Sequence, residues 1–231
     1  MREFLTSSSY FGLVATIFAF ELGLWVRRKT GHSAVNPMLI AIALLIVLLL
    51  GLDIEPASYS AAGASHLSYL LTPCTVALAI PLYRQMEALK NNLWAILGGI
   101  LSGVATCMVC IPVMALLMNL SHEQYVSLLS KSITTAIGIS MTEEMGGFVA
   151  ITIVAIYFTG TLGNIFADAL CRLFRLTEPV ARGIAIGTAS HAMGTARALE
   201  IGEVEGAMSG LSIAITGLVT AVVAPLFANI V

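Results

Sequence analysis

Six long apolar stretches dominate the sequence, and they decide the solvent in which the chain can fold. A helix needs about 20 mostly apolar residues to cross a bilayer. Charges are scarce: they make up 10% of the 231 residues, whereas an ordinary soluble domain has about a quarter. The sequence therefore predicts an all-α polytopic membrane protein with about six full spans. The stretches are Tyr10–Val26, Asn36–Leu52, Leu67–Tyr83, Leu93–Leu120, Gly147–Leu173 and Gly206–Val231.

Composition and motifs also argue against several classes of function. The net charge is −2 and no basic block exists beyond Arg27-Arg28-Lys29, so nucleic acid is not expected as a partner. No metal-ligand cluster or catalytic dyad can be specified, so we expect no cofactor, no metal and no enzymatic activity. Cys107 and Cys110 have CxxC spacing, but within an apolar run two small helix residues are more common than a redox or metal site.

Basic residues in short loops indicate how the spans are oriented, because Lys and Arg are enriched on the cytoplasmic side. The loops Asp53–Ser65 and Asn119–Glu123 contain neither residue and are predicted to lie outside. The N-terminus is then external, and four crossings return the chain to the outside near Leu120. Three loops are assigned to the cytoplasm by Arg27, Arg28 and Lys29, by Arg84 and Lys90, and by Arg172, Arg175 and Arg182.

A count of crossings then identifies a re-entrant segment. The chain is outside near Leu120 and inside at Arg172, so it crosses an odd number of times between them, and Gly147–Leu173 is one crossing. The less apolar segment Glu123–Gly146 must therefore enter and leave on the external face, as a re-entrant or broken helical hairpin. Non-helical backbone at membrane depth requires surrounding protein or a water-filled cavity.

A second polar segment, Arg182–Glu205, repeats features of the first. Motifs in the two segments match at an offset of 56 residues, although chance similarity between Gly- and Ala-rich segments is an alternative. If the repeat is real, the second hairpin starts from the cytoplasmic side. Two units of hairpin plus span then have opposite orientations, which is an architecture of secondary transporters. The matches are Ala136-Ile-Gly138 and Glu144-Met-Gly146 with Ala192-Met-Gly194 and Glu200-Ile-Gly202, and Thr159-Gly160 with Thr216-Gly217 at an offset of 57.

The whole chain, 1–231, is predicted to form a single integral membrane domain. Residues 1–122 supply spans that act as a scaffold and a dimerisation surface, and a homodimer is expected because Gly98, Gly99 and Gly103 allow close helix packing. Residues 123–231 form the inverted repeat of hairpin plus span.

The third span is predicted to be kinked or broken near Pro73, because proline removes a backbone donor. Thr72 and Thr75 would then face the same cavity as the hairpins. A purely structural kink is the alternative.

Each hairpin combines a cation with hydroxyls and small residues. Lys131 and Arg197 can neutralise a carboxylate, which Ser and Thr hydroxyls orient. The alternatives are that Lys131 snorkels to the external interface, and that Arg197 anchors the cytoplasmic side or pairs with Glu200 at i+3. The candidate substrate-binding residues are Lys131, Ser132, Thr134, Thr135, Ser190, His191, Gly194, Thr195 and Arg197, with Thr72 and Thr75.

Three residues are candidates for proton or ion coupling: His191, Glu144 and Glu200. His191 ionises near physiological pH, but it can equally donate a structural hydrogen bond between helices. The two glutamates either bind a coupling cation or cap the hairpins at an aqueous face. Nearby, Asp168 and Arg172 at i,i+4 are expected to form a surface ion pair, and Asn164 is expected to hydrogen-bond between helices.

Three runs resemble the LrgB/CidB family of membrane proteins: Leu70–Tyr83, Lys131–Thr135 and, most specifically, Gly187–Arg197. The similarity extends from about Tyr10 to Phe227. It implies a multi-pass protein of the bacterial plasma membrane with a small holin-like partner of the LrgA/CidA type. The family's usual Pro-Lys-Ser is Ser130-Lys131-Ser132 here, which leaves open where the first hairpin breaks.

Two functions follow from the residues and the resemblance. The first is a secondary transporter of a small monocarboxylate, proton-coupled, with substrate held between the hairpins. The resemblance implies such a substrate, because members of the family were assigned to the transport of pyruvate in Gram-positive bacteria and of glycolate and glycerate in plastids. The alternative is an antiholin-like or holin-like regulator of murein hydrolase activity and autolysis without its own transport. Two opposed polar hairpins favour the transporter, because a passive scaffold does not need them.

Overall fold

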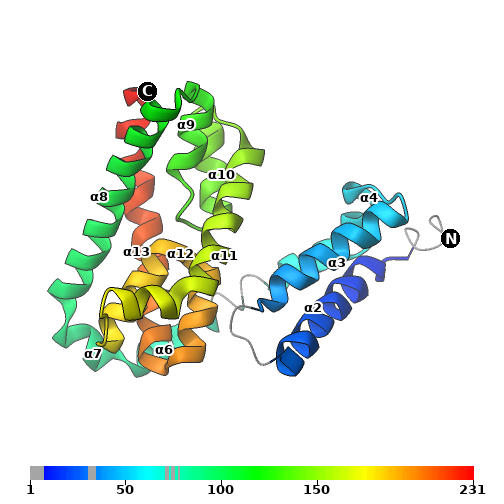
Figure 1. Cartoon of the computed structure of the whole chain (residues 1–231), viewed down its shortest axis with the longest axis horizontal. Helices are drawn as coiled ribbons and strands as arrows, with labels where there is room; N and C mark the ends of the chain where they lie inside the picture. The colour runs from blue at the N-terminus through cyan, green and yellow to red at the C-terminus, as the bar shows by residue number, and fades with distance from the viewer. Residues whose placement is uncertain (1–7, 31–34, 71–72, 74–75, 78) are drawn as a thin grey trace. The chain divides into compact units, whose positions relative to one another are not determined.

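The computed structural model describes residues 8–30, 35–70, 73, 76–77 and 79–231. All regular secondary structure in these residues is helical, and no strand occurs among them. The chain divides into two compact units, Met1–Ala77 and Leu78–Val231, whose helices are drawn in Figure 1.

In the unit Met1–Ala77, helices α2 (Phe11–Thr30) and α3 (Pro37–Gly51) pack side by side (Figure 1). Asn36 caps α3 by accepting a hydrogen bond from the Met38 N–H at 2.9 Å, and proline suits the first helical position. The short helices α4 (Pro56–Ala61) and η1 (Ala64–Leu70) follow. Helices α2 and α3 correspond to the first two predicted spans.

The third predicted span, Leu67–Tyr83, runs from the end of the first unit into the second. The structure describes its beginning as part of the 3-10 helix η1 and its end as part of helix α6 (Ala79–Arg84). Thr72 and Thr75 lie outside the described residues. The break near Pro73 and the contribution of these threonines to a site therefore stay predictions.

In the unit Leu78–Val231, three of the described helices are long and apolar enough to cross a membrane. They are α8 (Leu93–Met118), α11 (Val149–Leu173) and α13 (Glu203–Phe227), the last extended by η2 (Ala228–Ile230). Many of their large apolar side chains are exposed, among them Leu117 and Phe158, as expected for a surface that faces lipid. The protein is an all-α, multi-pass membrane protein, as predicted.

Between α8 and α11 the chain forms the first hairpin. Helices α9 (His122–Leu129) and α10 (Thr135–Glu144) have 8 and 10 residues, about 12 and 15 Å in length. Neither can cross a hydrocarbon core of about 30 Å. The Phe148 N–H donates to Ser127 Oγ at 2.7 Å, which holds α9 beside the start of α11. The segment therefore enters and leaves at one end of the unit, as the crossing count predicts.

The second hairpin is helix α12 (Pro179–Ile201), which folds back on itself at His191. That residue has φ 42° and ψ −141°, far from helical values. A Cβ on Gly194 would lie 3.0 Å from the backbone oxygen of Ile186, whereas a continuous helix would separate these residues by about 12 Å. The legs 179–190 and 192–201 therefore pack against each other.

The two hairpins enter from opposite ends of the unit. At one end, the base of the first hairpin meets the C-terminus, where Tyr125 donates to the Phe227 carbonyl at 2.7 Å. At the other end, Arg84 pairs with Glu203 at 3.6 Å, close to the base of the second hairpin. Figure 1 shows α9 with the C-terminus at one end and α6 at the other. Each hairpin precedes a 25-residue helix, α11 or α13. The two hairpins therefore have opposed orientations within this unit.

A short helix, α7 (Met86–Asn91), joins α6 to α8. It carries Lys90, and α6 carries Arg84. Both residues belong to one of the loops that the basic residues assign to the cytoplasm. The end of the unit that holds the base of the second hairpin is therefore its predicted cytoplasmic end.

Candidate functional site

A cavity of about 880 Å³ lies within the unit Leu78–Val231, between the tips of the two hairpins and helices α8, α11 and α13. The first hairpin contributes Lys131 and Ser132, and the second contributes Thr188 and Ser190. Residues from both predicted polar hairpins therefore share one cavity. Its other walls include Gly99, Ser102, Gly103, Thr106 and Cys107 of α8, Phe158, Thr159, Leu162 and Phe166 of α11, and Thr216 and Thr220 of α13.

Two glycines make room for the second hairpin beside α8 and α11. A Cβ on Gly103 would lie 2.6 Å from Thr188 Cγ2, and one on Gly160 would lie 2.7 Å from Cε1 of His191. Both separations are shorter than van der Waals contact, so a side chain at either position would displace the hairpin. The absence of a side chain allows the hairpin tip to reach the cavity.

Lys131 gives the cavity its positive charge. It is the one charged residue among the described residues that line the cavity, and it is partly buried. Its ammonium donates to Ser132 Oγ at 3.1 Å, and no described carboxylate pairs with it. An ammonium without a counter-ion, hydrogen-bonded to a hydroxyl, favours an anion as its ligand.

Two threonine hydroxyls at the cavity have no partner among the described residues. Thr188 and Thr216 are 8% and 2% exposed, and neither Oγ1 has a hydrogen bond. A buried polar group left unpaired costs about 1–3 kcal/mol. A molecule bound in the cavity can supply the missing partners.

Neither of these threonines was among the predicted site residues, yet the sequence carried a signal for each. Thr188 lies within the run Gly187–Arg197, and Thr216 matches Thr159 in the repeat at an offset of 57. Thr159 and Thr216 both line the cavity. The repeat therefore marked a pair of equivalent positions in the two following helices.

His191 holds the tip of the second hairpin against α11. The side chain is 4% exposed, and its Nε2 lies 3.0 Å from the backbone oxygen of Ile156. Because a carbonyl can only accept, the ring donates this bond. One of the two roles considered for His191, the interhelical hydrogen bond, is therefore present. Proton coupling by His191 stays a prediction.

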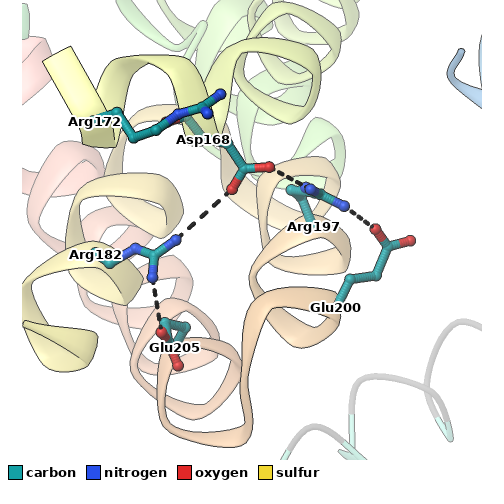
Figure 2. Close-up of polar contacts among 6 residues, drawn as sticks. All are labelled: Asp168, Arg172, Arg182, Arg197, Glu200 and Glu205. Carbon is teal, nitrogen blue, oxygen red and sulfur yellow. Dashed lines mark hydrogen bonds and ion pairs between the residues drawn. The ribbon is translucent and has the colours of Figure 1, made fainter. Parts of the chain in front are cut away.

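Arg197 lies at the base of the second hairpin and is not among the residues that line the cavity. Its Nη1 donates to Glu200 Oε2 at 2.6 Å, and its Nη2 donates to the carboxylate of Asp168 on α11 (Figure 2). The i+3 partner is the alternative considered for Arg197. Two carboxylates compensate its charge, so Lys131 is the cation available at the cavity among the described residues.

Asp168 connects both legs of the second hairpin to α11. Besides Arg197, its carboxylate pairs with Arg182 at 3.7 Å, and Arg182 also lies 3.5 Å from Glu205 Oε1 on α13 (Figure 2). The expected ion pair between Asp168 and Arg172 is a wrong prediction: Arg172 Nε donates to the backbone oxygen of Asp168 at 3.2 Å. The folded-back hairpin brings two other guanidinium groups to the carboxylate, a tertiary contact that spacing along α11 does not reveal.

The remaining predicted residues of the second hairpin lie inside its packing. Thr195 Oγ1 is 2.7 Å from Ser209 Oγ on α13 and donates to the His191 carbonyl at 3.1 Å. Gly194 allows the two legs of the hairpin to approach closely, because a Cβ there would lie 3.0 Å from the Ile186 backbone oxygen. Asn164 forms the expected interhelical bond, with its Nδ2 2.8 Å from the Met193 carbonyl.

In the first hairpin, Thr134 and Thr135 begin α10 and do not line the cavity. Glu144 is exposed where α10 ends, at the base of this hairpin, and Glu200 lies at the base of the other. The structure therefore brings Lys131, Ser132 and Ser190 of the predicted set to the cavity. Glu144 and Glu200, the two glutamates that are candidates for ion coupling, do not line the cavity.

A chain of buried hydroxyls supports the first hairpin behind Lys131. Ser130 Oγ lies 3.2 Å from Thr142 Oγ1, which lies 2.8 Å from Thr152 Oγ1 on α11. Thr152 in turn donates to the Ser127 carbonyl at 2.9 Å. These bonds connect both helices of the hairpin to α11 and fix the turn 130–134.

Comparison with known proteins places the sequence among a group of bacterial membrane proteins. The sequence model of the LrgB-like family matches residues 16–230. Curated proteins named "antiholin-like protein LrgB" from Bacillus mycoides (strain KBAB4), Bacillus cereus (strain B4264) and Bacillus anthracis (strain CDC 684 / NRRL 3495) are each 35% identical over 223 residues, covering 96% of both chains. No solved structure shows a significant match.

Proposed function

The chain belongs to the LrgB-like family, and on that premise we propose that it is a secondary transporter of a small monocarboxylate such as pyruvate or glycolate. One observation carries this proposal: the tips of two opposed hairpins line one cavity that contains an ammonium without a counter-ion. Charged groups at membrane depth are costly and are usually retained for function.

The chemistry of the cavity suits a small anion with a single negative charge. Lys131 pairs with the substrate carboxylate. The hydroxyls of Ser132 and Ser190, at the tips of the two hairpins, line the same cavity. A second carboxylate would find no cation among the described residues of the cavity, and burying an unpaired charge is expensive. The apolar side chains of Phe158 and Phe166 offer contact to the remainder of the substrate.

Opposed hairpins also suit alternating access. Each hairpin has its base at a different end of the unit and its tip at the cavity. Movement of one hairpin at a time would expose the cavity to one side of the membrane, as in transporters built from inverted repeats. Protons are the proposed coupling ion, and His191, Glu144 and Glu200 are the candidate carriers.

We expect the protein to act with a small holin-like membrane partner of the LrgA/CidA type, as the family resemblance implies. The test is uptake of labelled pyruvate into proteoliposomes that contain the full chain, with and without this partner. Lys131→Ala should abolish saturable uptake, whereas Lys131→Arg should retain some of it. Lys90→Ala, on an exposed residue of α7, is the matched control. Undiminished uptake in Lys131→Ala would overturn the proposed site.

The name of the relatives, antiholin-like protein, favours a second candidate function: regulation of murein hydrolase activity and autolysis without substrate transport. This function predicts no substrate-selective flux and tolerance of changes at the hairpin tips. Autolysis rates of cells that express wild type or Lys131→Ala separate the two. A regulator without transport would keep its effect in the variant, provided that the amount in the membrane is equal.

A further inference from the structure

Several hydroxyl side chains in the described helices bond to a carbonyl of the preceding turn, which is a common arrangement for Ser and Thr in apolar helices. At the cavity, Thr106 donates to the Ser102 carbonyl at 2.7 Å, and Ser102 donates to the Gly99 carbonyl at 2.8 Å. On α13, Ser212 likewise donates to the Met208 carbonyl at 2.8 Å. These hydroxyls are satisfied without a ligand.

Thr188 and Thr216 depart from this pattern. Both are more than nine-tenths buried, both line the cavity, and neither hydroxyl oxygen has a partner among the described residues. They come from different elements, the first leg of the second hairpin and helix α13. Two such residues in the walls of the cavity that contains Lys131 point to a ligand with more than a carboxylate to bind.

We infer that Thr188 and Thr216 bind the oxygen on carbon 2 of a 2-oxo or 2-hydroxy monocarboxylate, while Lys131 binds its carboxylate. This inference rests on the proposed function. A keto oxygen has two lone pairs and can accept from both threonine hydroxyls. A 2-hydroxyl can donate to one threonine and accept from the other. Either group satisfies both orphaned hydroxyls at once.

This assignment explains how the cavity can discriminate among small carboxylates of similar size. Propionate has the same carbon chain as pyruvate and the same charge, but no oxygen on carbon 2. Its binding would leave both threonine hydroxyls buried and unpaired. A site built to bond a substrate oxygen discriminates strongly against an analogue that lacks it.

The test measures KM for pyruvate and for propionate with the full chain in proteoliposomes, including the holin-like partner where uptake requires it. Wild type should have at least about a tenfold lower KM for pyruvate than for propionate. Thr188→Val and Thr216→Val should each raise the KM for pyruvate about tenfold and leave the KM for propionate unchanged or lower. Thr188→Ser and Thr216→Ser retain the hydroxyl and should restore the preference for pyruvate.

Thr106→Val is the matched control, because Thr106 lines the same cavity but bonds its own helix. It should leave the ratio of the two KM values unchanged. Equal KM values in wild type, a ratio unaffected by both valine variants, or an equal effect in Thr106→Val would each overturn the inference while transport itself stands.

Two further results distinguish failure of this inference from failure of a variant to fold or of the proposed function. If a valine variant does not reach the membrane, competition of unlabelled propionate against labelled pyruvate in wild type gives the discrimination directly. Competition by propionate as strong as by unlabelled pyruvate would contradict the inference. If wild type transports no monocarboxylate, the proposed function fails, and the inference fails with it.

Discussion

Arg182 and Arg197 contact the two oxygens of one carboxylate, that of Asp168. In a continuous helix these arginines would lie about 22 Å apart. Their common partner therefore shows that α12 is folded back at His191, and it fastens both legs of the hairpin to α11. The contact lies at the predicted cytoplasmic end of the unit.

Removing the charge of Asp168 should loosen this attachment. Asp168→Asn retains the shape of the side chain but leaves two guanidinium groups with weaker partners. We expect a loss of about 1–3 kcal/mol of stability, the contribution typical of hydrogen bonds to charged groups. Thermal unfolding in detergent measures it as a lowered Tm. Glu143→Gln, the same type of change on an exposed side chain of α10, should leave the Tm nearly unchanged, and equal shifts in both variants would contradict the role of Asp168.

A second prediction concerns Cys107, which lines the cavity with its Sγ 3.8 Å from Ser132 Oγ. Because Lys131 makes the cavity positive, an anionic thiol reagent should label Cys107 several-fold faster in wild type than in Lys131→Ala. Pyruvate should slow the labelling in wild type. The rate is measured by mass spectrometry in a chain whose other cysteines are replaced by serine.

A neutral thiol reagent provides the control for this experiment. It should label Cys107 at similar rates in the wild type and in Lys131→Ala, because the charge of Lys131 does not attract it. Faster labelling of wild type by both reagents would mean that the substitution changes access to the cavity rather than its potential.

Glycine at position 160 should be necessary for the position of the second hairpin. A Cβ there would lie 2.7 Å from the His191 ring, so Gly160→Ala must displace the ring or break its bond to Ile156. We expect a loss of about 1–3 kcal/mol and reduced uptake. On α13, a Cβ on Gly210 would meet no atom within 4 Å. Gly210→Ala should therefore stabilise the protein by about 0.5–1 kcal/mol, because alanine favours the helix. Equal Tm shifts in the two variants would refute this packing argument.

The sequence predicted those features of this fold that depend on local composition. The polarity of Glu123–Gly146 and the charge of Arg172 were enough to place the first hairpin, because lipid penalises exposed polar backbone. The cytoplasmic assignment of Arg172, Arg175 and Arg182 predicted the side from which the second hairpin starts. The contacts of Asp168 with Arg182 and Arg197 could not be predicted, because they exist only after α12 folds back. Likewise, only the packed structure distinguishes Thr188 from Thr106, since one hydroxyl lacks a partner and the other has one.

The final prediction separates the two roles considered for His191. Glutamine cannot carry a proton near neutral pH, but its N–H can donate to a carbonyl as the His191 ring does to Ile156. The hydrogen bond and the burial of the ring favour the structural role. We therefore expect His191→Gln to retain some of the pyruvate uptake, with the pH dependence of wild type. His191→Ala removes the donor, leaves space beside Gly160, and should abolish uptake and lower the Tm. If His191→Gln instead transports pyruvate but no longer responds to a proton gradient, His191 carries the coupling proton. In that case the bond to Ile156 holds the ring where the proton is transferred.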